Sequence, residues 1–338
     1  MPTLQDVAKY AGVSTATVSK VLSNTPYFTE ETRQKVVEAV KALGYRPNLA
    51  ARALSSGKTH IIAVVFPYIY DAIFKDPLVM HILEGIETAS TARGYNILLS
   101  TPRLSEDGPD ESYRQLVQSG YIEGMITIDN VPIASVGAVA EARNIPVVGI
   151  GYHAVAYTVR TDDYKGGMLM MEHAHTLGHQ HFGIITVEAG INFGLEERMK
   201  GLHHAAAEYH IPQENLHIAL GNFSTTSGAN AAETLIHAHP EITALLCLND
   251  RMAIGAIQYL HKIGKSVPKD ITVMGYDNIA LSAVINPPLT TIDQNPGDLG
   301  NIAFNMLLDV LNGEKPESIV LEPKLIIRRS DAPRCSAK

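Results

Sequence analysis

The polar side chains near the N-terminus have the types and spacing that contact nucleic acid. In the string LQDVAKYAGVSTATVSKVL (4–22), Gly12 can adopt the left-handed turn between two short helices, and Val13 and Val18 can close a small core. The second helix then presents hydroxyl, methyl and ammonium groups to base edges and phosphates. The residues expected to contact DNA are Ser14, Thr15, Ala16, Thr17, Ser19 and Lys20.

Helix signals surround this motif and define a small helical head. Thr3 and Ser14 can cap the two helices of the motif, and Thr29 can cap a third that ends at Gly44. Asn48 can cap a fourth, short helix after Arg46-Pro47. We therefore predict a helix-turn-helix domain over 1–46, followed by a hinge helix and linker over 47–59.

From residue 60 onward, short apolar runs alternate with helical stretches. This alternation predicts parallel sheets with helices on both faces, and its length favours two lobes. The predicted fold class is an all-α head plus a two-lobed α/β body over 60–338. The expected strands are 61–66, 95–100, 124–128, 145–150, 182–187, 216–220, 242–248 and 271–275.

Charge is divided unevenly along the chain. The 338 residues carry a net charge of −8. The first 58 nevertheless hold eight Lys or Arg against four acids, so a basic head precedes an acidic body.

No apolar run is long enough to span a membrane, and no secretory signal is present. Together with only two cysteines, these features predict a cytoplasmic protein.

Enzyme and metal chemistry find no support in the residue spacing. The histidine clusters at 173–175, 179–181 and 203–204 lack the HExxH or paired Cys/His spacing of a metal site. No GxSxG elbow, P-loop or GxGxxG after a strand is present. We therefore expect no enzyme activity, no metal site and no cofactor.

The chain resembles the lactose-repressor (LacI/GalR) family of bacterial transcription regulators over nearly its whole length. The strings that carry the resemblance in the head are LQDVAKYAGVSTATVSKVLS, TRQKV, LGYRPN and AARAL. Those in the body are ERMKGL, LNDRMAIGA, VMGYDN and PPLTTIDQ. The resemblance implies a homodimer that binds a near-palindromic operator.

For DNA, the resemblance implies a role for the hinge helix. Leu54 matches a leucine that intercalates at the central base step, and Ala51 allows two hinge helices to pack side by side. Asn48 matches a hinge-capping residue. Packing of Leu54 against the body remains the alternative.

For the body, the resemblance implies two lobes like those of periplasmic sugar-binding proteins, with a ligand between them. Three crossings are expected, near 159–162, 290–293 and 321–324. Lobe N then comprises about 60–159 and 292–321, and lobe C about 162–290 and 324–338.

The resemblance also implies effector contacts at Arg198, Asn249 and Asp277, whose guanidinium, amide and carboxylate suit vicinal hydroxyls. An ion pair, a helix cap and a turn cap are their respective alternatives. The further candidates are Phe223, Gln294, Tyr68, Asp76 and Arg160.

A sugar is the favoured effector because of Asn249 and the shortage of paired aromatic residues in lobe C. A nucleobase or other metabolite is the alternative, because purine-sensing relatives also carry the Arg and Asp positions. We predict a repressor of carbohydrate-utilisation genes that the sugar releases from its operator. A corepressor-dependent regulator is the alternative, and a transporter's solute-binding protein is a distant one.

Overall fold

The computed structural model describes residues 2–22, 28–45, 58–66, 76–105, 108–128, 136–152, 155–190 and 192–334. These residues form two units, 1–60 and 61–338, which are described separately below. Among the described residues, no helix is long and apolar enough to cross a membrane.

The first unit is a three-helix domain, composed of α1 (Leu4–Ala11), α2 (Thr15–Leu22) and α3 (Glu30–Leu43). Thr3 caps α1 through a capping box with Asp6, and Gly12 ends it in the left-handed conformation at φ 65°. A small apolar core joins the three helices. Its buried members are Val7, Ala8, Val18, Val21, Val36 and Ala39.

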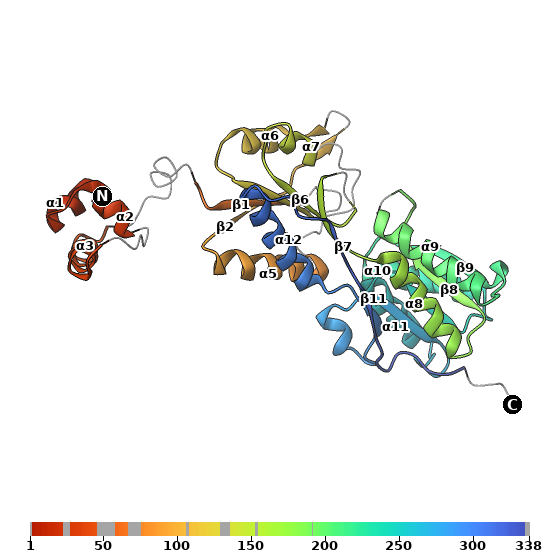
Figure 1. The fold of residues 1–338 in the computed structure, drawn as a ribbon. Helices are drawn as coiled ribbons and strands as arrows, with labels where there is room; N and C mark the ends of the chain where they lie inside the picture. The colour runs from red at the N-terminus through yellow and green to blue at the C-terminus, as the bar shows by residue number, and fades with distance from the viewer. Residues whose placement is uncertain are drawn as a thin grey trace. The chain divides into compact units, whose positions relative to one another are not determined.

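The second unit contains two six-stranded sheets, one in each lobe (Figure 1). The sheet of lobe N has the order β13-β7-β6-β5-β1-β2, and all its strands are parallel. Its strands are β1 (Ile61–Val65), β2 (Asn96–Ser100), β5 (Gly124–Ile128), β6 (Val147–Ile150), β7 (Tyr157–Thr161) and β13 (Ile319–Leu321). A separate two-stranded ribbon is formed by β3 (Leu104–Ser105) and β4 (Gly108–Pro109).

Helices cover both faces of this sheet, as Figure 1 shows for lobe N. One face packs on α5 (Pro77–Ala92) and α12 (Pro296–Leu311), and the other on α6 (Glu111–Gln118) and α7 (Val136–Glu141). Successive residues of β1 supply the two cores: Ile62 and Val64 face α5 and α12, whereas Ala63 and Val65 face the opposite helices. This double burial explains the unbroken apolar run at 61–66.

The sheet of lobe C has the order β14-β12-β11-β10-β8-β9, and only β14 is antiparallel to its neighbour. Its strands are β8 (Phe182–Thr186), β9 (Leu216–Leu220), β10 (Ala244–Cys247), β11 (Thr272–Asp277), β12 (Thr290–Asp293) and β14 (Lys324–Ile326). Its helices are α8 (Asp163–Thr176), α9 (Phe193–Glu208), α10 (Thr225–Ala238) and α11 (Asp250–Lys262), with short 3-10 turns at Gln213–Asn215 and Ala280–Ala283.

The first crossing falls within the expected range 159–162, because β7 pairs with β13 through Thr161. The second lies at the end of its expected range: β12 pairs with β11 and β14 through Asp293, so lobe N resumes after that residue rather than at about 292. Ladder hydrogen bonds hold β12 in the sheet of lobe C up to that point. The third crossing lies between Leu321 and Lys324.

Helices α8 and α9 pack with almost no space between their backbones. A Cβ atom added to Gly167 would lie 2.0 Å from the carbonyl oxygen of Arg198, and one added to Gly201 would lie 1.8 Å from that of Tyr164. Gly166 allows a similar approach by the ring of Tyr276. These glycines bring Asp163, Arg198 and Tyr276 together from three separate elements.

Candidate functional site

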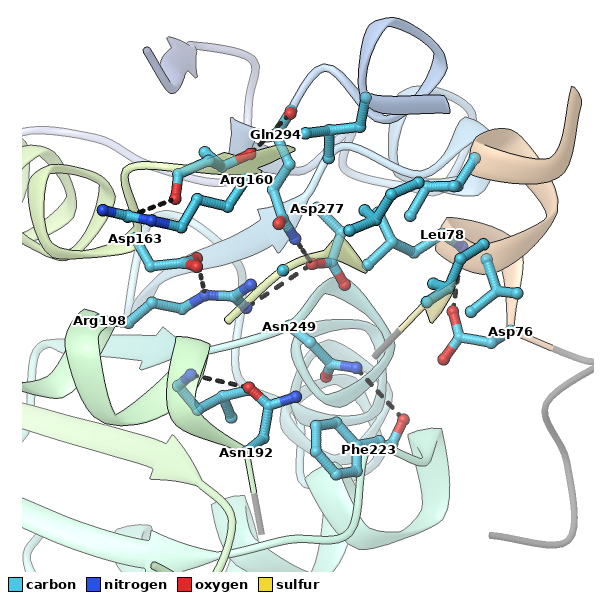
Figure 2. Close-up of a pocket in the computed structure, with 18 of the residues that line it drawn as sticks. Asp76, Leu78, Arg160, Asp163, Asn192, Arg198, Phe223, Asn249, Asp277 and Gln294 are labelled. Carbon is cyan, nitrogen blue, oxygen red and sulfur yellow. Dashed lines mark hydrogen bonds and ion pairs between the residues drawn. The ribbon is translucent and has the colours of Figure 1, made fainter. Parts of the chain in front are cut away.

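A cavity lies between the two lobes of the second unit, where the carboxyl ends of the parallel strands meet (Figure 2). Lobe N lines it mainly with aliphatic and aromatic side chains, and lobe C lines it mainly with charged and amide groups. The lining from lobe N is Phe66, Asp76, Leu78, Val79, Ile82, Ile128, Ile150, Gly151, Arg160, Thr161 and Leu299. The lining from lobe C and its crossing is Asp163, Asn192, Leu195, Arg198, Phe223, Asn249, Asp277 and Gln294.

Arg198 is the centre of the polar wall. It is 5% exposed, and its Nε donates to Oδ1 of Asp163 at 2.8 Å. Its Nη1 donates to the carbonyl oxygen of Leu248 at 2.7 Å and lies 3.7 Å from Oδ1 of Asp277. The guanidinium also covers the ring of Tyr276, 3.7 Å from its centroid. Contacts on several sides therefore hold the guanidinium in one orientation.

Two buried carboxylates balance this cation. Burial raises the pKa of Asp277 well above its ordinary value, although Arg198 opposes the shift. Burial likewise raises the pKa of Asp163, again against the attraction of Arg198. Burial also disfavours the Arg198 cation, but Asp163, Tyr276 and Asp277 outweigh that effect and raise the pKa of Arg198. The charges of Arg198, Asp163 and Asp277 thus stabilise one another in this buried wall. Removing one of the three groups would leave the others buried without an opposite charge.

Asp277 occupies the carboxyl end of β11 in an unusual backbone conformation, with φ at 117°. Its Oδ1 accepts a hydrogen bond of 2.6 Å from Nε2 of Gln294, which follows β12 on the crossing to lobe N. The carbonyl oxygen of Gln294 in turn accepts from Oγ1 of Thr161 at 2.9 Å. A chain of hydrogen bonds therefore runs from the polar wall to the crossings between the lobes.

Asn249 combines a structural role with its place in the cavity wall. Its Oδ1 caps α11 by accepting from Met252 N at 2.9 Å, and its Nδ2 donates to the carbonyl oxygen of Phe223 at 3.3 Å. The helix-cap alternative for Asn249 is therefore correct for its oxygen. Phe223, at φ 66°, lies beside it with a half-buried side chain (Figure 2).

Lobe N contributes two charged groups to the cavity. Asp76 caps α5 by accepting from Leu78 N at 3.0 Å, and its Oδ2 lies 3.6 Å from Nη1 of Arg251 on α11. Burial raises the pKa of Asp76, while Arg251 opposes that shift. Arg160 on β7 donates to the hydroxyl of Tyr152 at 3.0 Å and lies over its ring. The Asp76–Arg251 pair joins an element of one lobe to an element of the other.

The cavity brings together seven of the eight candidates for effector contact: Arg198, Phe223, Asn249, Asp277, Gln294, Asp76 and Arg160. The eighth, Tyr68, lies outside the described residues. Three polar lining residues were not predicted, namely Thr161, Asp163 and Asn192, and Thr161 is the last residue of β7. Asp163 directly follows the helix cap Asp162, and Asn192 caps α9. Asp163 and Asn192 were not singled out because polar residues are common at helix N-termini, where they hydrogen-bond to free backbone N–H groups.

The DNA candidates on the head lie mostly on the surface of α2. Ser14, Thr15, Ala16 and Lys20 are exposed, whereas Thr17 and Ser19 are half-buried. Oγ of Ser14 accepts from Thr17 N at 3.1 Å and lies 2.8 Å from the Thr17 hydroxyl, so it caps the helix. Thr17 is therefore less outward-facing than we expected, because its hydroxyl turns back toward that cap. Asn48, Ala51 and Leu54 lie outside the described residues.

Comparisons with known proteins agree with this architecture. Residues 3–48 match the model for bacterial regulatory proteins of the lacI family, and residues 171–330 match the periplasmic binding protein-like domain. The HTH-type transcriptional repressor PurR of Photorhabdus laumondii is 33% identical over 337 residues, covering 98% of this chain and 97% of that protein. The chain belongs to the LacI family of bacterial regulatory proteins. It is a DNA-binding transcriptional repressor with a two-lobed body, and members of this family are transcription regulators.

Solved structures of other LacI-family repressors share the fold. The lac repressor dimer bound to operator and the anti-inducer ONPF has a TM-score of 0.83 at 26% identity, with 98% of this chain and 99% of that chain covered. The complex of the transcriptional regulator CelR with cellobiose has a TM-score of 0.72 at 26% identity, with 98% of this chain and all of that chain covered.

Proposed function

We propose that this LacI-family repressor holds a carbohydrate between its lobes and leaves its operator when the carbohydrate binds. The observation that carries the proposal is the division of the cavity into a polar wall and an apolar wall. A sugar has the matching division, because its ring edge carries hydroxyls and its ring face is apolar. The complex of a related regulator with cellobiose supports the same ligand class.

On the polar wall, the carboxylate of Asp277 accepts from sugar hydroxyls, and the guanidinium of Arg198 donates to them. Asn249 and Gln294 supply amide groups on either side of that pair. The Arg198 contacts among the described residues use Nε and Nη1, so Nη2 is the nitrogen directed to a ligand. The strand ends and helix starts that position these groups make the wall largely preformed.

On the opposite wall, Leu78, Val79 and Ile128 contact the apolar ring face, together with Phe223 from lobe C. Asp76, Arg160 and Tyr68 add polar contacts from lobe N. Since the ligand touches both lobes, its binding favours one relative arrangement of them, and that preference is the source of allosteric coupling.

For DNA, Thr15, Ala16 and Lys20 on α2 contact base edges, while Ser14, Thr17 and Ser19 support the helix and reach phosphates. Asn48, Ala51 and Leu54 form a hinge that widens the minor groove. A near-palindromic operator requires two heads, so the functional unit is a cytoplasmic homodimer. No enzymatic step, metal or cofactor is needed for this switch.

Titration calorimetry on the purified repressor tests the ligand class. Ribose, glucose, galactose and cellobiose form one arm, and adenine, guanine and hypoxanthine form the other. Saturable binding of a sugar that weakens retention on the promoter DNA beside the gene supports the proposal. Binding of a base alone, or a sugar that strengthens DNA retention, would overturn it.

A nucleobase-dependent corepressor is the second candidate. It is favoured by the 33% identity to a PurR repressor over almost the whole chain. The Arg198 and Asp277 pair suits the edge of a base as well as a diol, since both present donors and acceptors side by side. Tighter promoter binding with any of the three bases, together with no response to sugars, selects this candidate.

A further inference from the structure

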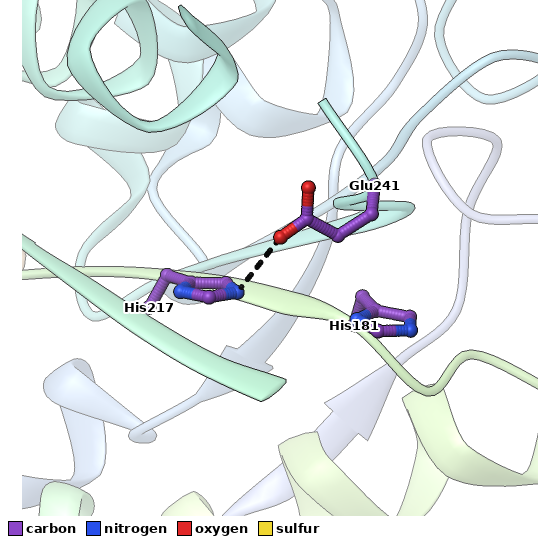
Figure 3. A group of neighbouring side chains, drawn as sticks. All are labelled: His181, His217 and Glu241. Carbon is purple, nitrogen blue, oxygen red and sulfur yellow. Dashed lines mark ion pairs between the residues drawn. The ribbon is translucent and has the colours of Figure 1, made fainter. Parts of the chain in front are cut away.

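Three side chains of types that can ligate a metal converge in lobe C, away from the cavity between the lobes (Figure 3). His181 directly precedes β8, His217 is the second residue of β9, and Glu241 lies between α10 and β10. One potential ligand atom from each lies within 4.8 Å of the others. The three residues are far apart in sequence, which is why spacing along the chain gave no indication of a site.

The separation between two of the three side chains already matches that of a metal site. Nε2 of His217 lies 3.4 Å from Oε1 of Glu241. Zinc holds nitrogen and oxygen ligands at about 2.0–2.2 Å, so two ligands of a tetrahedral ion lie roughly 3.3–3.5 Å apart. The carboxylate of Glu241 is 43% exposed and has room to rotate toward an ion.

The imidazole nitrogens have unused bonding capacity. Nδ1 of His181 and Nε2 of His217 are buried atoms with no hydrogen-bond partner. Buried polar atoms are normally paired, so two such atoms in one cluster require an explanation. A shared cation would use both lone pairs and the carboxylate charge at once.

A fourth residue, His239, supports the cluster. Its ring stacks on that of His217 with centroids 3.5 Å apart, and its Nδ1 lies 3.4 Å from Oε1 of Glu241. It therefore restrains two of the three ligands, as residues next to metal ligands commonly do. Burial, together with His239 and His181, also lowers the pKa of His217, which favours the neutral form that binds metal.

We propose that His181, His217 and Glu241 form a site for a divalent late transition metal, with Zn²⁺ the best fit, and that water completes its coordination. Two imidazoles and one carboxylate are a ligand set that zinc accepts. The softer Cys ligands are absent from the cluster, and its nitrogen content disfavours Mg²⁺ and Ca²⁺.

The position of the site predicts what the metal does. All three ligands lie at or before the amino ends of β8, β9 and β10, whereas Asn192, Phe223 and Asn249 follow the carboxyl ends of the same strands. These are opposite edges of a parallel sheet. Bound metal therefore joins three segments of lobe C and stabilises this lobe without occupying the effector cavity.

The test uses untagged full-length repressor, stripped with chelator and then dialysed against ZnCl₂. We expect close to one zinc per chain by elemental analysis, a higher melting temperature with zinc, and a tetrahedral Co²⁺ absorption spectrum. His217→Gln and Glu241→Gln should each weaken zinc binding at least tenfold and lose the zinc-dependent rise in melting temperature. His261→Ala, which removes an exposed histidine on α11, should bind zinc like the wild type.

The Glu241→Gln variant separates loss of the metal from loss of the fold, because Glu241 is partly exposed and the replacement keeps its shape. Its melting temperature without zinc should match that of the metal-free wild type. The proposal is overturned if the wild type retains no zinc, if both ligand variants bind zinc as it does, or if His261→Ala loses as much binding as they do.

Discussion

The two walls of the cavity are built in different ways. The wall from lobe C is polar, and its central guanidinium is fixed by Asp163, Leu248, Asp277 and the ring of Tyr276. The wall from lobe N is dominated by apolar side chains of α5, β5, β6 and α12. Under the proposed function, this contrast assigns ligand selection by directed hydrogen bonds to lobe C and less directional apolar contacts to lobe N.

Arg198→Met should produce the largest effect, because it removes the centre of the polar wall. We expect effector affinity to fall by about 2–4 kcal/mol, or roughly 30- to 1000-fold, since a buried partner is left unsatisfied. Titration calorimetry measures the loss with the sugar that binds the wild type in the proposed screen. Ile128→Val, on the apolar wall, is the matched control and should cost at most about 0.8 kcal/mol of effector affinity, because it removes one methylene from the apolar contact. Equal losses in the two variants would remove the proposed division between the walls.

Gly167→Ala should disturb the polar wall without touching the ligand. The new methyl would lie 2.0 Å from the carbonyl oxygen of Arg198, so α8 and α9 must move apart. We expect the free energy of unfolding to fall by about 1–3 kcal/mol or more. Denaturant unfolding gives the value. Gly297→Ala on α12 meets no atom within 4 Å and should be neutral or slightly stabilising. A neutral Gly167→Ala would mean that this close packing is not required.

Arg251→Ala tests the ion pair that joins the two lobes. Arg251 and Asp76 are 3.6 Å apart and 23% and 24% exposed, so the pair contributes about 0.2–1 kcal/mol. If it favours the closed arrangement, effector affinity should fall by up to about fivefold. The salt dependence of that affinity should also become shallower. Unchanged effector affinity of Arg251→Ala at both low and high salt would show that the Asp76–Arg251 pair does not contribute to effector binding.

A fold of this kind is largely predictable from its sequence. All eight apolar runs became strands. Six of them lie inside the sheets, where burial on both faces requires continuous apolar sequence, whereas β2 and β9 are partly exposed edge strands. Strands β7, β12, β13 and β14 were not predicted as strands. β7 reads YTVRT and alternates in polarity, and β13 and β14 have three residues each. Such short or mixed segments carry little periodic signal.

The residues of the cavity could likewise be predicted only in part from the sequence. The resemblance placed Arg198, Asn249 and Asp277 at the site, but it gave no indication that Asp163 is the partner of Arg198. That pair depends on how closely α8 and α9 approach, which Gly167 and Gly201 allow. The cluster of His181, His217 and Glu241 was missed for a related reason, because it arises from strand order rather than from local spacing.

His179 provides the smallest expected effect, on the pH dependence of lobe C. Its ring contacts Oγ1 of Thr243 and the carbonyl oxygen of Ala332, and burial lowers its pKa. The folded state therefore binds this proton less readily than the unfolded chain does. Stability should be fully present above the ordinary pKa of about 6.5 and should decline as the pH falls below it. His179→Gln should flatten that decline in denaturant unfolding at about pH 7.5 and 5.5. If the free energy of unfolding falls equally in both proteins between these pH values, groups other than His179 cause the decline.

The most direct test of the central proposal is the affinity for the promoter fragment in wild type and in Arg198→Met. It is measured with and without the sugar that binds the wild type in the calorimetric screen. Saturating sugar should weaken wild-type binding at least tenfold, which corresponds to about 1.4 kcal/mol of coupling. At the same sugar concentration, the variant should bind the fragment as the sugar-free wild type does. Tighter wild-type binding on addition of the sugar, or equal release of both proteins from the DNA, would contradict control through the polar wall.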